Sequence, residues 1–124
     1  MILLDSSILI DLFRKTDKKK SVFYKLLNTE SEFAISSITH YEIGIGNKRS
    51  NSDYWNELYD NLTVIPFDKN CSETAIDIYL DLKKRNKLID LADLLIGATA
   101  VTHGLTLATL NKKHFERIEK VELK

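Results

Sequence analysis

The chain has 124 residues, enough for one domain with a substantial core and too few for two. Hydrophobic residues make up 44% of it and charged residues 29%, proportions that are ordinary for a soluble globular protein. Because 18 basic and 18 acidic residues cancel, bulk charge indicates no partner, and any polyanion site must be a local patch.

The first predicted elements are a buried strand at residues 2–4 and a helix directly after it. The opening MILLDSSILIDLF is apolar, but Asp5 and Asp11 interrupt it and no basic region precedes it, so a signal peptide is not expected. No window reaches the roughly 18 apolar residues of a membrane helix. The single Cys71 excludes an internal disulfide. Together these features predict a soluble, cytoplasmic protein.

Short apolar runs then alternate with longer helical patterns along the rest of the chain. Helical spacing predicts helices at residues 22–27, 75–82 and 91–101, with Gly104 as the stop of the last one, and a helical pattern also holds Tyr54, Trp55 and Tyr59. Further strands are expected at 33–36, 62–67 and 105–109, with a weak fifth in VEL near the C-terminus. This alternation predicts an α/β fold with a mostly parallel sheet covered on both faces.

Polar residues follow several of these strands, and ligands of open α/β sheets bind beyond the carboxyl ends of the strands. Asp5 follows the first strand, and Asn111 comes just after the fourth. Glu42 lies one or two turns into the helix after the second strand, and Asp93 lies in the first turn of the helix before the fourth. We therefore expect Asp5, Glu42 and Asp93 to face one crevice.

Each acid also has a simpler interpretation. Asp5 would suit a helix N-cap, but Ser6 and Ser7 stand ready for that role, which favours a functional role for Asp5. Glu42 would suit the solvent face of an amphipathic helix, and by itself it decides nothing. Capping accounts fully for Asp90, whereas Asp93 is short for a capping box and runs at once into the apolar LLIGATA. We predict that Asp90 caps the helix and that Asp93 binds metal.

Three carboxylates in one crevice would repel each other unless a cation lies between them. Hard oxygen ligands suit Mg²⁺ or Mn²⁺, which leave room for phosphate oxygens. Such an ion can orient a phosphodiester and lower the pKa of an attacking water. The three acids therefore indicate metal-dependent phosphodiester chemistry.

Three segments, MILLDSSILIDLF, ISSITHYEIGIG and DLLIGATAVTHGLTLATLNKKHFERI, resemble the PIN-domain ribonucleases. They are most similar to the VapC-type toxins of toxin–antitoxin (VapBC) pairs. The resemblance implies a three-layer α/β/α sandwich and a Mg²⁺- or Mn²⁺-dependent endoribonuclease that cleaves RNA by metal-activated water. It also implies a cognate VapB-type antitoxin and a homodimer as partners. By this match Asp5, Glu42 and Asp93 are the catalytic, metal-binding acids, and Ser7 is the small hydroxyl residue after the first.

The chain departs from the family pattern after the fourth strand. Many members carry a fourth acid there, whereas this chain offers Asn111, an uncharged auxiliary ligand. One-metal chemistry is therefore the expectation. His114 stands where members often have an acid, and we interpret it as a surface residue without a catalytic role.

An RNA-cleaving protein of zero net charge needs local basic residues to hold phosphates. Basic pairs follow each site segment and are the expected substrate contacts: Arg14 and Lys15, Lys48 and Arg49, Lys112 and Lys113.

Two other functions compete with the nuclease. A receiver-like signalling module fits the length and the α/β alternation, but it would need two adjacent acids after strand one, where this chain has DSS. A PIN-like domain that binds RNA or protein without cleaving is the second, because Asn111 replaces an acid.

Overall fold

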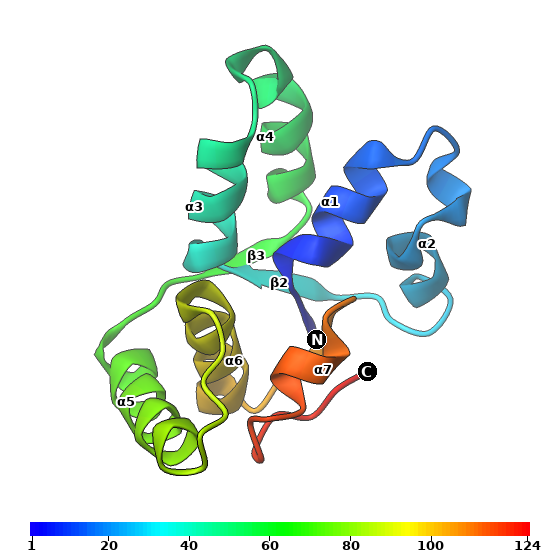
Figure 1. Ribbon diagram of the computed structural model, residues 1–124. Coiled ribbons are helices and arrows are strands. Elements are labelled where there is room, and N and C mark those ends of the chain that lie inside the picture. The colour runs from blue at the N-terminus through cyan, green and yellow to red at the C-terminus, as the bar shows by residue number, and fades with distance from the viewer.

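The computed structural model describes residues 1–124 and has a four-stranded sheet between two groups of helices (Figure 1). The strands are β1 (Ile2–Leu4), β2 (Phe33–Ser36), β3 (Thr63–Ile65) and β4 (Thr106–Ala108). The helices are α1 (Ser6–Arg14), α2 (Val22–Leu26), α3 (Ser37–Gly46), α4 (Ser52–Asp60), α5 (Lys69–Lys84), α6 (Leu91–His103) and α7 (Lys112–Phe115). Short 3₁₀ turns occupy Lys18–Lys20 and Arg49–Asn51. No helix combines the length and the apolar character that crossing a membrane requires.

All four strands are parallel, in the order β3-β2-β1-β4. The predicted fifth strand is reduced to one bridge between Leu107 and Leu123. Strand β3 is shorter than predicted because it stops before Pro66, which has no N–H for the ladder. In a receiver the first strand lies between the second and third, whereas here β1 lies between β2 and β4. The strand order therefore rules out the receiver-like alternative.

Alternate residues of each strand supply two separate cores, one on each face of the sheet. Leu3, Ala34 and Leu107 pack against α5, α6 and the C-terminal segment. Ile2, Leu4 and their neighbours on β2 pack against α1 to α4 on the opposite face. This period-two alternation produces the three-layer α/β/α sandwich that the sequence predicted.

Helix α6 ends as the sequence predicted, at Gly104. This residue has φ of 63°, in the left-handed region, and its N–H closes the helix on the carbonyls of Ala100 and Val101. Glycine takes this conformation without the steric cost that a Cβ brings. Strand β4 begins two residues after this turn, so the turn determines where the carboxyl end of β4 lies.

Candidate active site

The candidate site lies at the carboxyl ends of β1 and β4, where the strand order reverses. The chain runs outward from β1 through β2 to β3 and then returns to place β4 on the other side of β1. Such a switch point leaves a crevice between strand ends. Asp5 enters it directly from β1, and its backbone N–H donates to the Ala108 carbonyl at 2.9 Å, so both strand ends are tied together.

Asp5 is only 2% exposed, and two hydroxyl groups hold its carboxylate. Oγ of Ser7 donates to Oδ2 at 2.7 Å, and Oγ1 of Thr109 donates to the same oxygen at 2.8 Å. Oδ1 is thereby left available to a ligand. Asp5 occupies the N-cap position of α1, but its side chain makes no capping hydrogen bond. The expectation that Ser6 or Ser7 would take the cap position is wrong, because both are already helical and their hydroxyls hold acids.

Glu42 reaches the same edge from α3 and is linked to α1 through Ser6. Oγ of Ser6 donates to Oε1 of Glu42 at 2.7 Å and lies 3.3 Å from Oγ1 of Thr39. Ser36, at the end of β2, caps α3 by accepting from the Ile38 N–H at 3.0 Å. Because Ser36 sets where α3 begins, it also sets which side of the helix Glu42 occupies. The Glu42 side chain is therefore bonded to another helix and does not point only to solvent, which was the alternative for an amphipathic helix.

Asp93, in the first turn of α6, brings a second carboxylate into the electrostatic field of Asp5. Burial, and then the negative charge of Asp5, raises the pKa of Asp93 above its ordinary value of 3.8. Nδ1 of His114 lies 3.3 Å from Oδ2 of Asp93 and opposes this rise. His114 is a surface residue as predicted, with a side chain 46% exposed, but it also contacts a site acid, which the sequence interpretation missed.

Asp90 takes the N-cap position of α6, as predicted, but its side chain makes no capping hydrogen bond. Its backbone carbonyl accepts from the Leu94 N–H at 3.0 Å, while the exposed carboxylate stays out of the first turn. Its charge adds to the rise in the pKa of Asp93. Asp90 thus acts on α6 through its position and charge rather than through a side-chain cap.

The donor set suits a hard divalent cation, although the side chains do not yet close around one point. No three His, Cys, Asp or Glu side chains converge closely enough to form a ligand cluster. The charge of Asp5 acts on Asp93, whereas Glu42 is bonded to the hydroxyl of Ser6, the residue after Asp5 in the chain. A cation would relieve the repulsion that the charge of Asp5 exerts on the ionised Asp93, and carboxylate oxygens are ligands that suit Mg²⁺ or Mn²⁺.

The predicted substrate contacts are spread over the molecule. Lys112 begins α7, which packs against α6, the helix that carries Asp93. Arg14 lies at the far end of α1 from Asp5, and Lys48 and Arg49 lie beyond the end of α3. None of these four cations forms an ion pair, whereas Lys15 pairs with Asp11 at 3.4 Å and is thereby occupied.

Three residues join the site that sequence reasoning did not assign to it: Ser6, Thr109 and His114. Thr109 could have been found, because it directly follows β4 just as Asp5 directly follows β1. Ser6 and His114 act across α1–α3 and α6–α7 contacts, which no local pattern in the sequence encodes. Asn111 is exposed near the site, and its backbone N–H donates to Oγ1 of Thr109 at 2.9 Å.

Comparison with known proteins shows the family of the chain. A ribonuclease VapC1 of Methanocaldococcus jannaschii is 39% identical, over 99% of this chain and 85% of the relative. A ribonuclease VapC1 of Rickettsia felis is 34% identical, over 98% of this chain and 93% of the relative. The solved structure of VapBC2 from Rickettsia felis, bound to a DNA fragment from their promoter, has a TM-score of 0.87 at 28% identity, and the match covers 100% of this chain and 98% of that one. The family model of the PIN domain matches residues 2–121, so the chain belongs to the PIN-domain family.

Proposed function

We propose that the protein is a metal-dependent endoribonuclease, the toxin of a type II toxin–antitoxin pair. The observation that carries the proposal is the buried Asp5 beside the half-buried Asp93 at the β1–β4 switch point, where burial and then the charge of Asp5 raise the pKa of Asp93. Two neighbouring acids of this kind are expected where a cation is to be bound. The relatives named as VapC ribonucleases support RNA as the substrate.

In the proposed site Asp5, Asp93 and Glu42 would hold Mg²⁺ or Mn²⁺. When bound, this cation would supply the charge that polarises a phosphodiester and activates water. Ser7 and Thr109 keep the Asp5 carboxylate in one orientation, and Ser6 does the same for Glu42. Lys112, and more distantly Arg14, Lys48 and Arg49, would neutralise phosphates of the RNA strand. Asn111 is the auxiliary oxygen donor.

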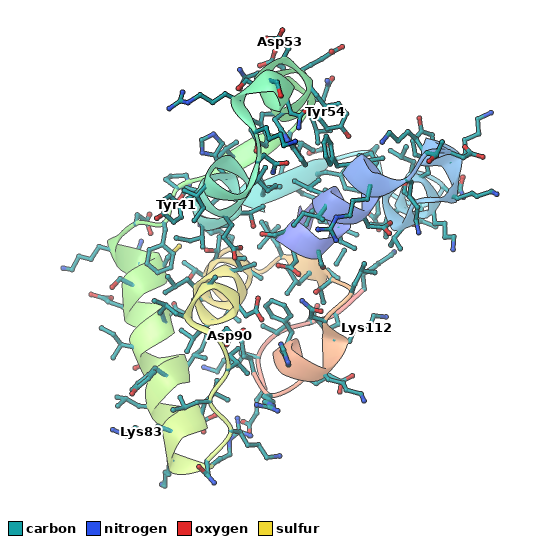
Figure 2. All side chains as sticks on the ribbon, turned by 45° about the horizontal axis from the view of Figure 1, so that its top comes forward. Tyr41, Asp53, Tyr54, Lys83, Asp90 and Lys112 are labelled. Atoms are coloured by element: carbon teal, nitrogen blue, oxygen red, sulfur yellow. The ribbon has the colours of Figure 1, made fainter.

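The first test replaces the acids by their isosteric amides. Asp5→Asn and Asp93→Asn are expected to abolish RNA cleavage while the circular dichroism spectrum stays unchanged, because the amide keeps the volume but not the charge that retains a cation. Asp53→Asn is the matched control, since Asp53 is exposed at the start of α4, far from Asp90 and the site (Figure 2). Cleavage by a folded Asp93→Asn variant at the wild-type rate would refute the proposed site.

The second test removes the cation. EDTA is expected to stop cleavage by the wild type, and added Mg²⁺ or Mn²⁺ to restore it. Calorimetric titration with Mn²⁺ should show binding to the wild type and at least a tenfold loss of affinity in Asp93→Asn. Undiminished cleavage in EDTA would show that the nuclease does not depend on a metal. Binding of RNA without any cleavage would favour the non-cleaving PIN-like alternative.

We also propose that the protein binds a cognate VapB-type antitoxin, supported by the VapBC complex to which the chain is similar. For the homodimer we propose the surface of α5 and α6 that holds Ile76, Tyr79, Leu80 and Leu91, here called the α5–α6 face. These four side chains are 42% to 71% exposed. Lys83 borders this face, with its Nζ 5.9 Å from the centre of the Tyr79 ring.

A further inference from the structure

A second pocket lies away from the acids, between α3 and α4, which stand side by side on the α1–α4 face of the sheet (Figure 1). It has a volume of about 310 Å³. Most of the residues that line it are polar, among them Asn47, Lys48, Arg49, Ser52 and Asn56. We call it the α3–α4 pocket. Glu42 belongs to the same helix but points to Ser6 on α1, so the pocket and the acids use different sides of α3.

Trp55 forms part of the wall and carries an unsatisfied hydrogen-bond donor. The residue is 4% exposed, and its indole Nε1 is the only buried side-chain nitrogen or oxygen of the chain without a partner. The ring is held on both sides, by Phe13 at a centroid distance of 5.1 Å and by Tyr59 at 6.2 Å. A buried donor without an acceptor is rare in native proteins and calls for a ligand or a solvent partner.

The charge of the lining defines the kind of acceptor that would fit. Lys48 and Arg49 stand at the mouth without ion pairs, and no aspartate or glutamate lines the pocket. Asn47 uses its Nδ2 to donate to the Ile43 carbonyl at 2.8 Å, which leaves its amide oxygen available. Asn56 and Ser52 add further groups that can donate or accept. An anionic group with a polar, planar body attached would satisfy both the cations and the amides.

We propose that the α3–α4 pocket binds one unpaired nucleotide of the RNA strand, outside the acidic site that would cleave it. Lys48 and Arg49 would contact its phosphate, and Asn47 and Asn56, beside the Trp55 wall, would meet the edge of its base. Aromatic and amide side chains beside a basic rim are the usual means of holding single-stranded RNA. This inference rests on the proposed ribonuclease function, because it takes RNA as the substrate.

Gly44 provides a way to fill the pocket without damaging the protein. It lines the wall, and a Cβ built on it meets nothing within 4 Å, so a side chain there would point into free space. Gly46 also has nothing within 4 Å but does not line the pocket. Both glycines lie in α3, where leucine is a better helix former than glycine. Gly44→Leu and Gly46→Leu are therefore a matched pair of test and control.

The test uses Trp55 as its own probe, because it is the only tryptophan of the chain. The full-length protein in EDTA, where no cleavage is expected, is titrated with a short mixed-sequence single-stranded RNA and, separately, with the four nucleoside monophosphates. Saturable change of the tryptophan emission is expected for the wild type and for Gly46→Leu. Gly44→Leu should bind about tenfold or more weakly, because its side chain would occupy the space of the base and remove the hydrogen bonds to the edge of the base.

Other outcomes overturn the inference. If inorganic phosphate produces the same change at the same concentration as the nucleotides, the pocket recognises no base. If Gly44→Leu binds the RNA like Gly46→Leu but loses the antitoxin in a pull-down, the occupant is a protein. Failure of the nuclease proposal looks different: the wild type would not cleave RNA in Mg²⁺ or Mn²⁺. A wild type that cleaves, with unchanged Trp55 emission and an equally active Gly44→Leu variant, would refute the pocket alone.

Discussion

At the scale of single residues, the hydroxyl groups around Asp5 explain how a buried acid can stay ordered. Ser7 and Thr109 both donate to one oxygen of Asp5, and the Ser7 hydroxyl also accepts from the Leu110 N–H at 3.0 Å. These bonds tie the end of β1 to the loop after β4. The acid is thus held by groups from both sides of the switch point, and its orientation depends on them.

Removing either hydroxyl should therefore weaken the site without abolishing it. Thr109→Val keeps the shape of the side chain and Ser7→Ala removes one small group, and each is expected to lower the cleavage rate and the Mn²⁺ affinity by roughly 10- to 100-fold, as outer ligand partners usually do. Cleavage kinetics and calorimetric titration would measure this. Wild-type affinity in both variants would mean that Asp5 needs no such support.

Asp93 predicts a pH dependence of stability whose sign follows from its raised pKa. The folded state holds the proton more tightly than the unfolded chain, so this contribution to stability is fully present below the unfolded pKa of 3.8 and is lost as the pH rises through the folded pKa. At neutral pH without metal, the ionised Asp93 opposes folding. Asp93→Asn should therefore raise the melting temperature in EDTA at neutral pH, and this gain should shrink as the pH falls toward 3.8. A lower melting temperature would contradict the assignment.

At the scale of elements, Asp11 links α1 to α2. Its Oδ2 accepts from the Val22 N–H at 2.9 Å, at the start of α2, and Lys15 lies 3.4 Å from Oδ1. The hydrogen bond from Val22, assisted by Lys15, lowers the pKa of Asp11. This linkage could not be predicted from the sequence, because Asp11 and Val22 are separated by a turn whose path no local pattern fixes.

Asp11 should stabilise the pairing of these helices at neutral pH. Because its folded pKa is lowered, its contribution is present above the unfolded pKa of 3.8 and is lost as the pH falls through the lower folded value. Asp11→Ala is expected to reduce the free energy of unfolding by about 1–2 kcal/mol, the worth of a hydrogen bond to a charged acceptor. Urea unfolding at neutral pH and at acid pH would measure it, and an equal loss at both would show that the charge is irrelevant.

Helix α6 was predicted from the sequence, yet its packing was not. Its apolar spacing and the Gly104 stop gave its bounds to within two residues at the end. The close approach of the C-terminal segment gives no such signal: a Cβ on Gly97 would lie 2.6 Å from Cδ1 of Ile118.

Gly97 should therefore not tolerate a branched residue. Gly97→Val is expected to cost about 1–3 kcal/mol of stability through overpacking, against a small gain in helix propensity. Thermal unfolding by calorimetry would measure the cost. Wild-type stability in Gly97→Val would mean that Ile118 moves aside freely.

At the scale of the whole molecule, the sequence predicted the layers and the edge where the acids lie, because buried strands are apolar and each is followed by polar residues. It could not predict which face each helix covers, since a parallel crossover leaves the same pattern on either face. It likewise could not identify the exposed apolar surfaces, because Ile76 and Leu80 share a helix with the buried Ile78 and Leu82 and look equally apolar.

The α5–α6 face yields the last prediction. Large side chains exposed together on a folded chain usually mark a contact surface, and a stable dimer buries on the order of 800 Å² on each partner. A shallow pocket lined by Ile76, Tyr79, Leu80 and Leu91 would receive the same side chains of a second copy about a two-fold axis.

Leu80→Glu is expected to weaken the dimer at least tenfold, because it would bring two buried charges together. Light scattering on the Leu80→Glu variant without antitoxin should show monomers. The control variant Leu27→Glu, which alters an exposed leucine at the C-terminal end of α2, should stay dimeric. A dimeric Leu80→Glu variant that no longer binds the antitoxin would assign this face to the antitoxin instead.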